Sequence, residues 1–281
     1  MASQNHLNEQ SISPIILIKG AGEQASGIAA RCFWAGLRVM MTEIDQPLAI
    51  RRTVAFSEAA FTGKTVVEGI PCVRAADPQD ALAMMNNGQI ALLIDPTAEL
   101  AEHLSPLVLI DAIMAKRNTG TCRHPGRLTL GVGPGFTAGE DVDAVIETNR
   151  SHFLGRVYYQ GCAQEDTGVP GDIIGAHADR VAHANNHGTF RTEREIGDHV
   201  DAGAVIGWLD GEPILAVISG VLRGLMRSGQ KVRPRTKLAD IDPRDRPEYC
   251  RFISDKALAI GGGALQAIFH YQHSLKMGGK P

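Results

Sequence analysis

The feature that most restricts the fold is a glycine turn between an apolar run and a helical pattern. Residues 15–18 are all aliphatic, the run ends at Gly20, and a second apolar run follows at 37–41. Between the two runs, apolar side chains recur at helical spacing until Gly36. Because buried parallel strands read as continuous apolar runs, this strand, turn, helix and strand predict a βαβ unit.

The same alternation continues through the first half of the chain. Further apolar runs occur at 90–94, 107–110 and 128–132, and a helical pattern occurs at 78–85. Alternating β and α elements favour a parallel sheet with helices on both faces. We therefore expect an α/β protein that begins with a Rossmann-like domain over 14–175, with a small hairpin inserted at 64–73 and an open border between 155 and 185.

Beyond residue 180, short β segments alternate with Gly, Asp and Pro, and an internal repeat appears. Similar residues recur at positions 32 residues apart. The first copy of the repeat contains Gly188, Phe190, Gly197, Val200 and Ile206, and the second contains Gly220, Leu222, Gly229, Val232 and Leu238. This repeat predicts a small β structure with pseudo-twofold symmetry over 180–243. The segment resembles the barrel-sandwich fold of biotinyl and lipoyl carrier domains, and an unrelated Gly-rich β meander is the alternative. The carrier domains present a modified lysine on the hairpin that joins their two halves. The corresponding residues here, 209–214, include no lysine, so we expect the barrel-sandwich shape without the swinging-arm function of the carriers.

The chain closes with a helical segment at 250–272, which we expect to pack back on the first domain. Ser254 is a suitable N-cap for it. Glycines 261–263 either break the helix or allow another segment to approach its backbone closely. The neighbouring 254–256 either hold a ligand or only cap the helix.

The first glycine turn matches the pattern Gly-x-Gly-x-x-Gly/Ala. Gly20 permits a tight turn, Gly22 lets a pyrophosphate approach, and the small Ala25 allows close packing of helix and strand. Ala21 lies between the glycines, and Glu43 ends the second strand where an acid holds a ribose hydroxyl. We predict a cofactor-binding loop. A structural turn with a solvated Glu43 is the alternative, and the charge of Glu23 opposes an anion.

Two further loops follow predicted strands. Gly133 and Gly135 lie in a glycine-rich turn after 128–132, at a strand end where open α/β sheets place ligands. Lys116 and Arg117 lie on a polar loop that begins at a strand end, and they are suited to binding phosphate or carboxylate groups. The alternative to ligand binding is that loop geometry alone requires Gly133 and Gly135, and that Lys116 and Arg117 are simply solvated.

Composition and charge exclude several classes of protein. A net charge of −3 and an aromatic content of 5% speak against nucleic-acid binding. No apolar run approaches the roughly 18 residues that a membrane span needs, and the N-terminus lacks the pattern of a signal peptide. Five widely spaced cysteines favour a reducing compartment, so we expect a cytoplasmic protein. The histidines lack zinc-site spacing, and we predict no metal.

Several sequence blocks, in order, carry a resemblance to a known family. They include IKGAG, MTEIDQPLAIRRTVAFSEA, DAIMAKRNTGT, GVGPGFTAGEDVDAVIET and ISDKALAIGGGALQAI. Over almost the whole chain, the sequence resembles the YqeB-like accessory proteins of selenium-dependent molybdenum hydroxylase systems. The family usually has Asp-Leu-Ala after its first Gly-Ala-Gly, whereas this chain has Glu23-Gln24-Ala25.

The resemblance implies maturation of molybdenum hydroxylases, through preparation or insertion of their cofactor. The ligand would be NAD or a molybdopterin-type nucleotide, held by the glycine loops together with Lys116 and Arg117. The expected partners are this nucleotide or pterin ligand, a molybdenum hydroxylase and further copies of the chain, with neither nucleic acid nor membrane. An NAD-dependent oxidoreductase is the alternative function. No catalytic residue is identified, so whether the protein is an enzyme stays open.

Overall fold

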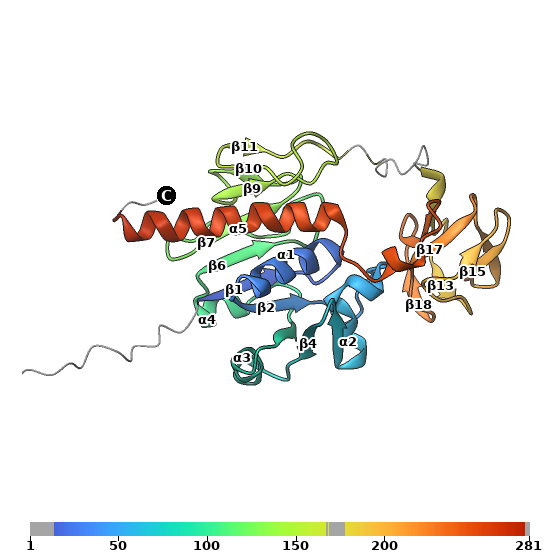
Figure 1. Cartoon of the computed structure of the whole chain (residues 1–281), viewed down its shortest axis with the longest axis horizontal. Coiled ribbons are helices and arrows are strands. Elements are labelled where there is room, and N and C mark those ends of the chain that lie inside the picture. The colour runs from blue at the N-terminus through green and yellow to red at the C-terminus, as the bar shows by residue number, and fades with distance from the viewer. Residues whose placement is uncertain (1–13, 167, 169–177, 279–281) are drawn as a thin grey trace, which may run out of the picture.

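The computed structural model describes residues 14–166, 168 and 178–278. A large sheet with helices on both faces lies beside a smaller β unit, which forms one end of the molecule (Figure 1). Residues 167 and 169–177, within the border expected between 155 and 185, lie outside the described residues.

The large sheet contains nine strands. Their bounds are β1 (Ile15–Lys19), β2 (Arg38–Glu43), β3 (Lys64–Val67), β4 (Ile70–Arg74), β5 (Ile90–Ile94), β6 (Val108–Asp111), β7 (Leu128–Val132), β9 (Ala144–Ile146) and β10 (Val157–Tyr158). The spatial order is β10-β9-β7-β6-β1-β2-β5-β4-β3. A separate pair of strands is formed by β8 (Thr137–Ala138) and β11 (Gly161–Cys162).

The predicted α/β class is confirmed, whereas the predicted parallel sheet is corrected to a mixed one. The strands from β4 to β9 in the spatial order run parallel, whereas β3 pairs antiparallel with β4 and β10 pairs antiparallel with β9. A two-residue turn joins β3 to β4, and two strands joined by so short a turn can pair only in antiparallel fashion. The hairpin expected at 64–73 forms one of these edges, and the sheet is therefore mixed.

Helices cover both faces of this sheet. The structure has α1 (Glu23–Trp34), α2 (Ala59–Thr62), α3 (Pro78–Asn86), α4 (Leu100–Leu104) and α5 (Asp255–Lys276), with short 3-10 turns η1 (Arg52–Val54), η2 (Phe56–Glu58), η3 (Ala178–Arg180) and η4 (Pro247–Cys250). Ile16 and Ile18 of β1 are buried with α1 and α5, while Leu17 is buried with α3 and α4. This alternation is the expected one for a central strand.

The C-terminal helix α5 is continuous through its three glycines. Ser254 caps it by accepting a hydrogen bond from the Ala257 amide at 3.3 Å. A Cβ atom at Gly261 would lie 2.8 Å from the carbonyl oxygen of Gly27 in α1, and one at Gly263 would collide with the carbonyl oxygen of Gly155. The glycines therefore allow close approach of neighbouring backbone, one of the two expectations. In Figure 1, α5 runs alongside α1.

The smaller β unit consists of two four-stranded antiparallel sheets around one apolar core. Their strands are β12 (Val181–His183), β13 (Gly188–Arg191), β14 (His199–Val200), β15 (Val205–Leu209), β16 (Glu212–Leu215), β17 (Gly220–Leu225), β18 (Gln230–Val232) and β19 (Lys237–Asp242). The orders are β12-β19-β17-β14 and β16-β15-β13-β18. The expected barrel-sandwich-like domain is corrected accordingly, because the strands pair as two separate sheets. The proposed limits 14–175, 180–243 and 250–272 stay a prediction.

The 32-residue repeat is visible in how the strands pair. Gly188 of β13 lies opposite Val232 of β18, and the equivalent pair is Val200 of β14 opposite Gly220 of β17. Each of these pairs takes one strand from the first copy of the repeat and one from the second. The two copies are therefore interleaved rather than placed side by side as independent units.

No helix within the described ranges has the length and apolar character that a membrane crossing requires.

Candidate functional site

The strand order places a topological switch point between β1 and β6. From β1 the chain passes through α1 to β2 on one side, and it later returns to β6 on the other side of β1. Open α/β sheets bind ligands in the crevice beyond the carboxyl ends of such strands. The first glycine turn follows β1 at this edge, and the loop 112–121 follows β6.

The first glycine turn combines a crowded start with an open end. Gly20 has a φ of +98°, and a Cβ atom there would lie 3.0 Å from the Cα of Ile113. Gly22 is the N-cap residue of α1 and supplies no side-chain cap, and a Cβ atom there would have nothing within 4 Å. Ala25 is fully buried in the packing of α1 against the sheet. A side chain at position 22 would therefore meet open space at the start of α1.

Glu43 is bound to the turn itself. Its Oε2 accepts a hydrogen bond from the Ala21 amide at 2.9 Å, and its Oε1 accepts one from the Ile44 amide at 2.8 Å. Burial raises the pKa of the Glu43 carboxyl above its ordinary value, while these two hydrogen bonds act in the opposite direction. The carboxylate thus holds the turn in place, and its predicted contact with a ribose stays a prediction.

The second glycine turn packs against the loop that follows β6. At Gly135, where φ is +104°, a Cβ atom would lie 2.5 Å from the Cα of Arg117. At Gly133, a Cβ atom would lie 2.8 Å from Oγ1 of Thr148. These contacts explain both glycines through loop packing, the alternative that the sequence left open. The loop 112–121 therefore contacts both glycine turns, because Arg117 lies against Gly135 and Ile113 lies against Gly20.

The two predicted cations differ in their surroundings. The ammonium of Lys116 lies 2.5 Å from Oδ2 of Asp166, and the Lys116 backbone has a φ of +60°. Arg117 is exposed, and its guanidinium has no ion pair or hydrogen bond with the residues that the structure describes. Of the two side chains, Arg117 is the one available to a ligand without displacing a carboxylate.

A buried ion pair that sequence reasoning missed anchors the loop after β6. The ammonium of Lys19 lies 3.5 Å from Oδ2 of Asp111, and both side chains are at least 95% buried. Thr121 Oγ1 donates to the same carboxylate at 2.5 Å and accepts from Lys19 at 3.3 Å. The pattern that could have revealed this network is a lysine ending an otherwise apolar buried strand, because unpaired charges are rarely buried.

A second group that the sequence did not identify lies where α1 and α5 begin. Arg51, almost fully buried, bonds through Nη1 to Oε1 of Glu23 at 3.2 Å, which offsets the charge of Glu23 at the start of α1. Lys256 is half-buried and has no ion pair among the described residues. Burial, followed by the charge of nearby Arg150, lowers the pKa of Lys256. A cation in the first helical turn is unusual, since it opposes the helix dipole.

The described residues contain no group of three or more His, Cys, Asp or Glu side chains arranged to hold a metal ion.

No protein-family model matches the chain. The chain is 45% identical over 259 residues to "Uncharacterized protein YqeB" of Escherichia coli strain K12, an alignment that covers 92% of this chain and 48% of that protein. The chain thus spans about half the length of this relative. The identity supports the YqeB-like resemblance, but the relative's name carries no information on selenium or molybdenum enzymes.

Several solved structures have a weak likeness to the chain. A succinylglutamate desuccinylase/aspartoacylase from Rhodobacter sphaeroides is 14% identical with a TM-score of 0.26, and an aspartoacylase family protein from Mesorhizobium loti is 11% identical with a TM-score of 0.25. The product-bound ectoine utilization protein EutE (DoeB) from Ruegeria pomeroyi is 11% identical with a TM-score of 0.24. Each match covers 82% of this chain and 85% of the other chain.

These neighbours correct the predicted function. They are described as desuccinylase, aspartoacylase and ectoine-utilization proteins, rather than as molybdenum hydroxylase accessory proteins, Rossmann nucleotide-binding proteins or NAD-dependent oxidoreductases. Neither the predicted maturation role nor the alternative oxidoreductase role has a counterpart among these neighbours. The likeness is too weak to transfer a hydrolase activity to this chain. Binding of NAD or a molybdopterin-type nucleotide as such, and the predicted protein partners, stay predictions.

Proposed function

We propose that the protein binds a small anion, bearing a phosphate or a carboxylate group, at the carboxyl edge of β1 and β6. The observation that carries this proposal is the open start of α1. The amides of Gly22, Glu23 and Gln24 have no acceptor among the described residues, and a Cβ atom on Gly22 would have no protein atom within 4 Å. Unpaired amides and the helix dipole together favour an anion.

Cationic side chains near this edge support the proposal. Arg117 is exposed and unpaired on the loop that touches the Gly20 turn, and Lys256 is half-buried and unpaired at the start of α5. Keeping the ammonium of Lys256 partly out of water is unfavourable without a counter-charge. An anion at the start of α1 would supply that charge, because Glu23 there is already paired with Arg51.

The geometry of Gly22 makes a direct test possible. Its φ of −67° suits any residue, and a Cβ atom there would meet nothing within 4 Å, so substitution leaves the fold intact. In Gly22→Asp, the new carboxylate would cap the free amides and occupy the position of the anion. Gly22→Ala is the matched control, because it adds a side chain but leaves the amides free.

Binding is measured by calorimetric titration with inorganic phosphate, AMP and succinate. We expect at least one of these probes to bind the wild-type protein and Gly22→Ala with similar affinity. We expect Gly22→Asp to bind that probe at least about tenfold more weakly, as for loss of one charge-assisted contact. Equal affinity of Gly22→Asp and Gly22→Ala, or no binding of any probe to the wild-type protein, would refute the proposal.

A further pair of variants tests the role of the cation. Lys256→Gln removes the unpaired ammonium near α1, whereas Lys276→Gln removes a lysine from the last turn of the same helix. We expect only Lys256→Gln to weaken binding of the probe. Similar losses in both variants would indicate an effect of net charge rather than of a site.

A further inference from the structure

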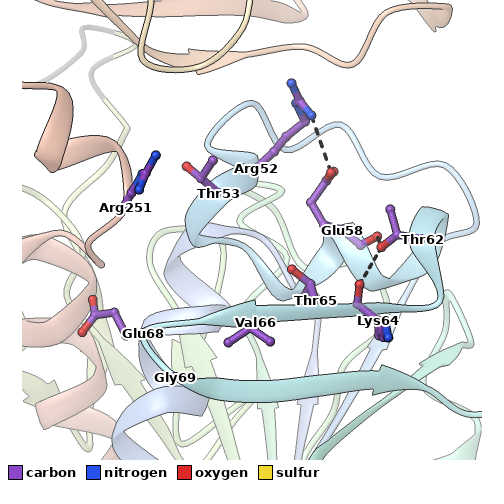
Figure 2. Close-up of a pocket in the computed structure, with 10 residues that line it drawn as sticks. All are labelled: Arg52, Thr53, Glu58, Thr62, Lys64, Thr65, Val66, Glu68, Gly69 and Arg251. Atoms are coloured by element: carbon purple, nitrogen blue, oxygen red, sulfur yellow. Dashed lines mark hydrogen bonds and ion pairs between the residues drawn. The ribbon is translucent and has the colours of Figure 1, made fainter.

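A cavity of about 540 Å³ lies away from the glycine turns, between the β3–β4 hairpin, η1 and the segment that leads into α5 (Figure 2). Arg52 and Thr53 come from η1, Thr65 and Val66 come from β3, and Arg251 faces them from the C-terminal segment. The volume falls within the range of roughly 300–1,000 Å³ that is typical of small-molecule sites. None of the predicted site residues lines this cavity.

Hydrogen bonds fix the backbone that carries Arg251. The buried guanidinium of Arg51 donates to the carbonyl oxygens of Tyr249 and Phe252, at 3.2 and 3.4 Å. The hydroxyl of Thr53 donates to the carbonyl oxygen between them, that of Cys250. On the hairpin, Glu68 accepts a hydrogen bond from the Ile253 amide at 2.6 Å. Arg251 is therefore presented to the cavity from a segment held on both sides.

The charges around the cavity leave Arg251 without a partner. The carboxylate of Glu58 is shared between Arg227, at 2.6 Å, and Arg52, at 3.6 Å. The carboxylate of Glu68 is engaged with a backbone amide, as described above. Arg251 has no ion pair with any residue that the structure describes, and the same is true of Lys64 at the far end of β3.

We infer that this cavity binds a small organic anion, whose carboxylate or phosphate group is held by Arg251. A planar guanidinium can bind either group through two parallel hydrogen bonds. The hydroxyl of Thr65 has no partner among the described residues and faces the cavity as a second polar contact (Figure 2).

The test separates this site from the one at the start of α1. Succinate, citrate, inorganic phosphate and AMP are titrated into the Gly22→Asp protein, in which the first site is blocked. We expect one class of probe, carboxylate or phosphate, to bind with a stoichiometry of one. Adding Arg251→Gln should weaken this binding at least about tenfold, the loss expected for a charge-assisted contact. If no anion binds at the start of α1, the expected effect of Arg251→Gln on binding in the cavity stays the same.

The control is Arg233→Gln, which removes an exposed arginine from the smaller β unit. It changes the net charge equally and should leave the affinity unaltered. A second variant, Thr65→Val, keeps the shape of the side chain and should weaken binding to a smaller extent. Absence of binding to the Gly22→Asp protein for all four probes, or equal affinities of Arg251→Gln and Arg233→Gln, would overturn the inference.

Discussion

The Glu43 carboxylate lies 2.9 Å from the amide nitrogen of Ala21 and so joins the end of β2 to the turn that follows β1. This contact connects the two strands that flank α1 at the carboxyl edge of the sheet. It gives Glu43 a role in positioning the glycine turn.

The contact predicts a specific dependence of stability on pH. Burial raises the folded-state pKa of Glu43, so the folded protein ionises this group less readily than the unfolded chain. The wild-type protein should therefore lose stability relative to Glu43→Gln as the pH rises from about 4.5, the ordinary value, through the folded pKa. Urea denaturation of both proteins at several pH values measures this difference. A difference that grows in favour of the wild-type protein over that range would contradict the prediction.

The salt bridge between Arg150 and Asp255 predicts the opposite trend. Two hydrogen bonds of 2.7 and 2.8 Å join the guanidinium to the carboxylate, and they lower the pKa of Asp255 to about 2. The stabilisation is therefore complete above the ordinary pKa of 3.8 and is lost as the pH falls towards 2. Because both side chains are well exposed, we expect Asp255→Asn to cost no more than about 1 kcal/mol at neutral pH.

Denaturation of Asp255→Asn and the wild-type protein between pH 7 and pH 2 tests this prediction. The two stabilities should converge at the acidic end, and a difference that does not change with pH would count against it.

The glycines of α5 give a prediction with an internal control. Gly262→Ala adds a methyl group where nothing lies within 4 Å, and it should stabilise the protein by about 0.5–1 kcal/mol through helix propensity. At Gly261 the same methyl group would lie 2.8 Å from the Gly27 carbonyl oxygen and 2.7 Å from Cγ of Arg31. Gly261→Ala should therefore destabilise the protein by about 1–3 kcal/mol.

Thermal denaturation of the two variants decides between packing and propensity. If both alanines stabilised the helix equally, α1 and α5 would not pack as closely as the structure shows.

The buried pair formed by Lys19 and Asp111 predicts strong coupling between two substitutions. Lys19→Met leaves a carboxylate in a buried site without its cation, and it should cost about 3–5 kcal/mol. The double variant with Asp111→Leu removes both charges and should recover a large part of this loss. A double-mutant cycle from chemical denaturation measures the coupling, and simple additivity of the two losses would show that the pair is not energetically linked.

Sequence patterns predicted the elements that depend on local periodicity. The strand at residues 90–94, the hairpin at 64–73 and the helix at 78–85 agree with β5, the β3–β4 pair and α3 within a few residues. These segments combine apolar periodicity with local turn or capping residues, such as Asp77, whose side chain caps α3. Information of this kind lies within a short stretch of chain.

The features that sequence reasoning missed depend on contacts between distant segments. Lys19 and Asp111 are separated by many residues, and so are Arg51 and the carbonyl oxygens at 249 and 252 that it binds. The glycines at 133 and 135 could be assigned equally to a ligand or to packing, because either use requires a bare backbone. Only the position of Arg117 against Gly135 shows that packing is sufficient to explain the second glycine.

The interleaved strands of the smaller β unit have a consequence for its ancestry. Because β13 pairs with β18 and β14 pairs with β17, the first copy of the 32-residue repeat on its own lacks one of the two partners of β13 and the partner of β14. Two separate copies of such a half could complete each other only by exchanging strands as an intertwined homodimer. Duplication and fusion of the corresponding gene segment would turn that bimolecular association into a unimolecular one, which no longer depends on protein concentration.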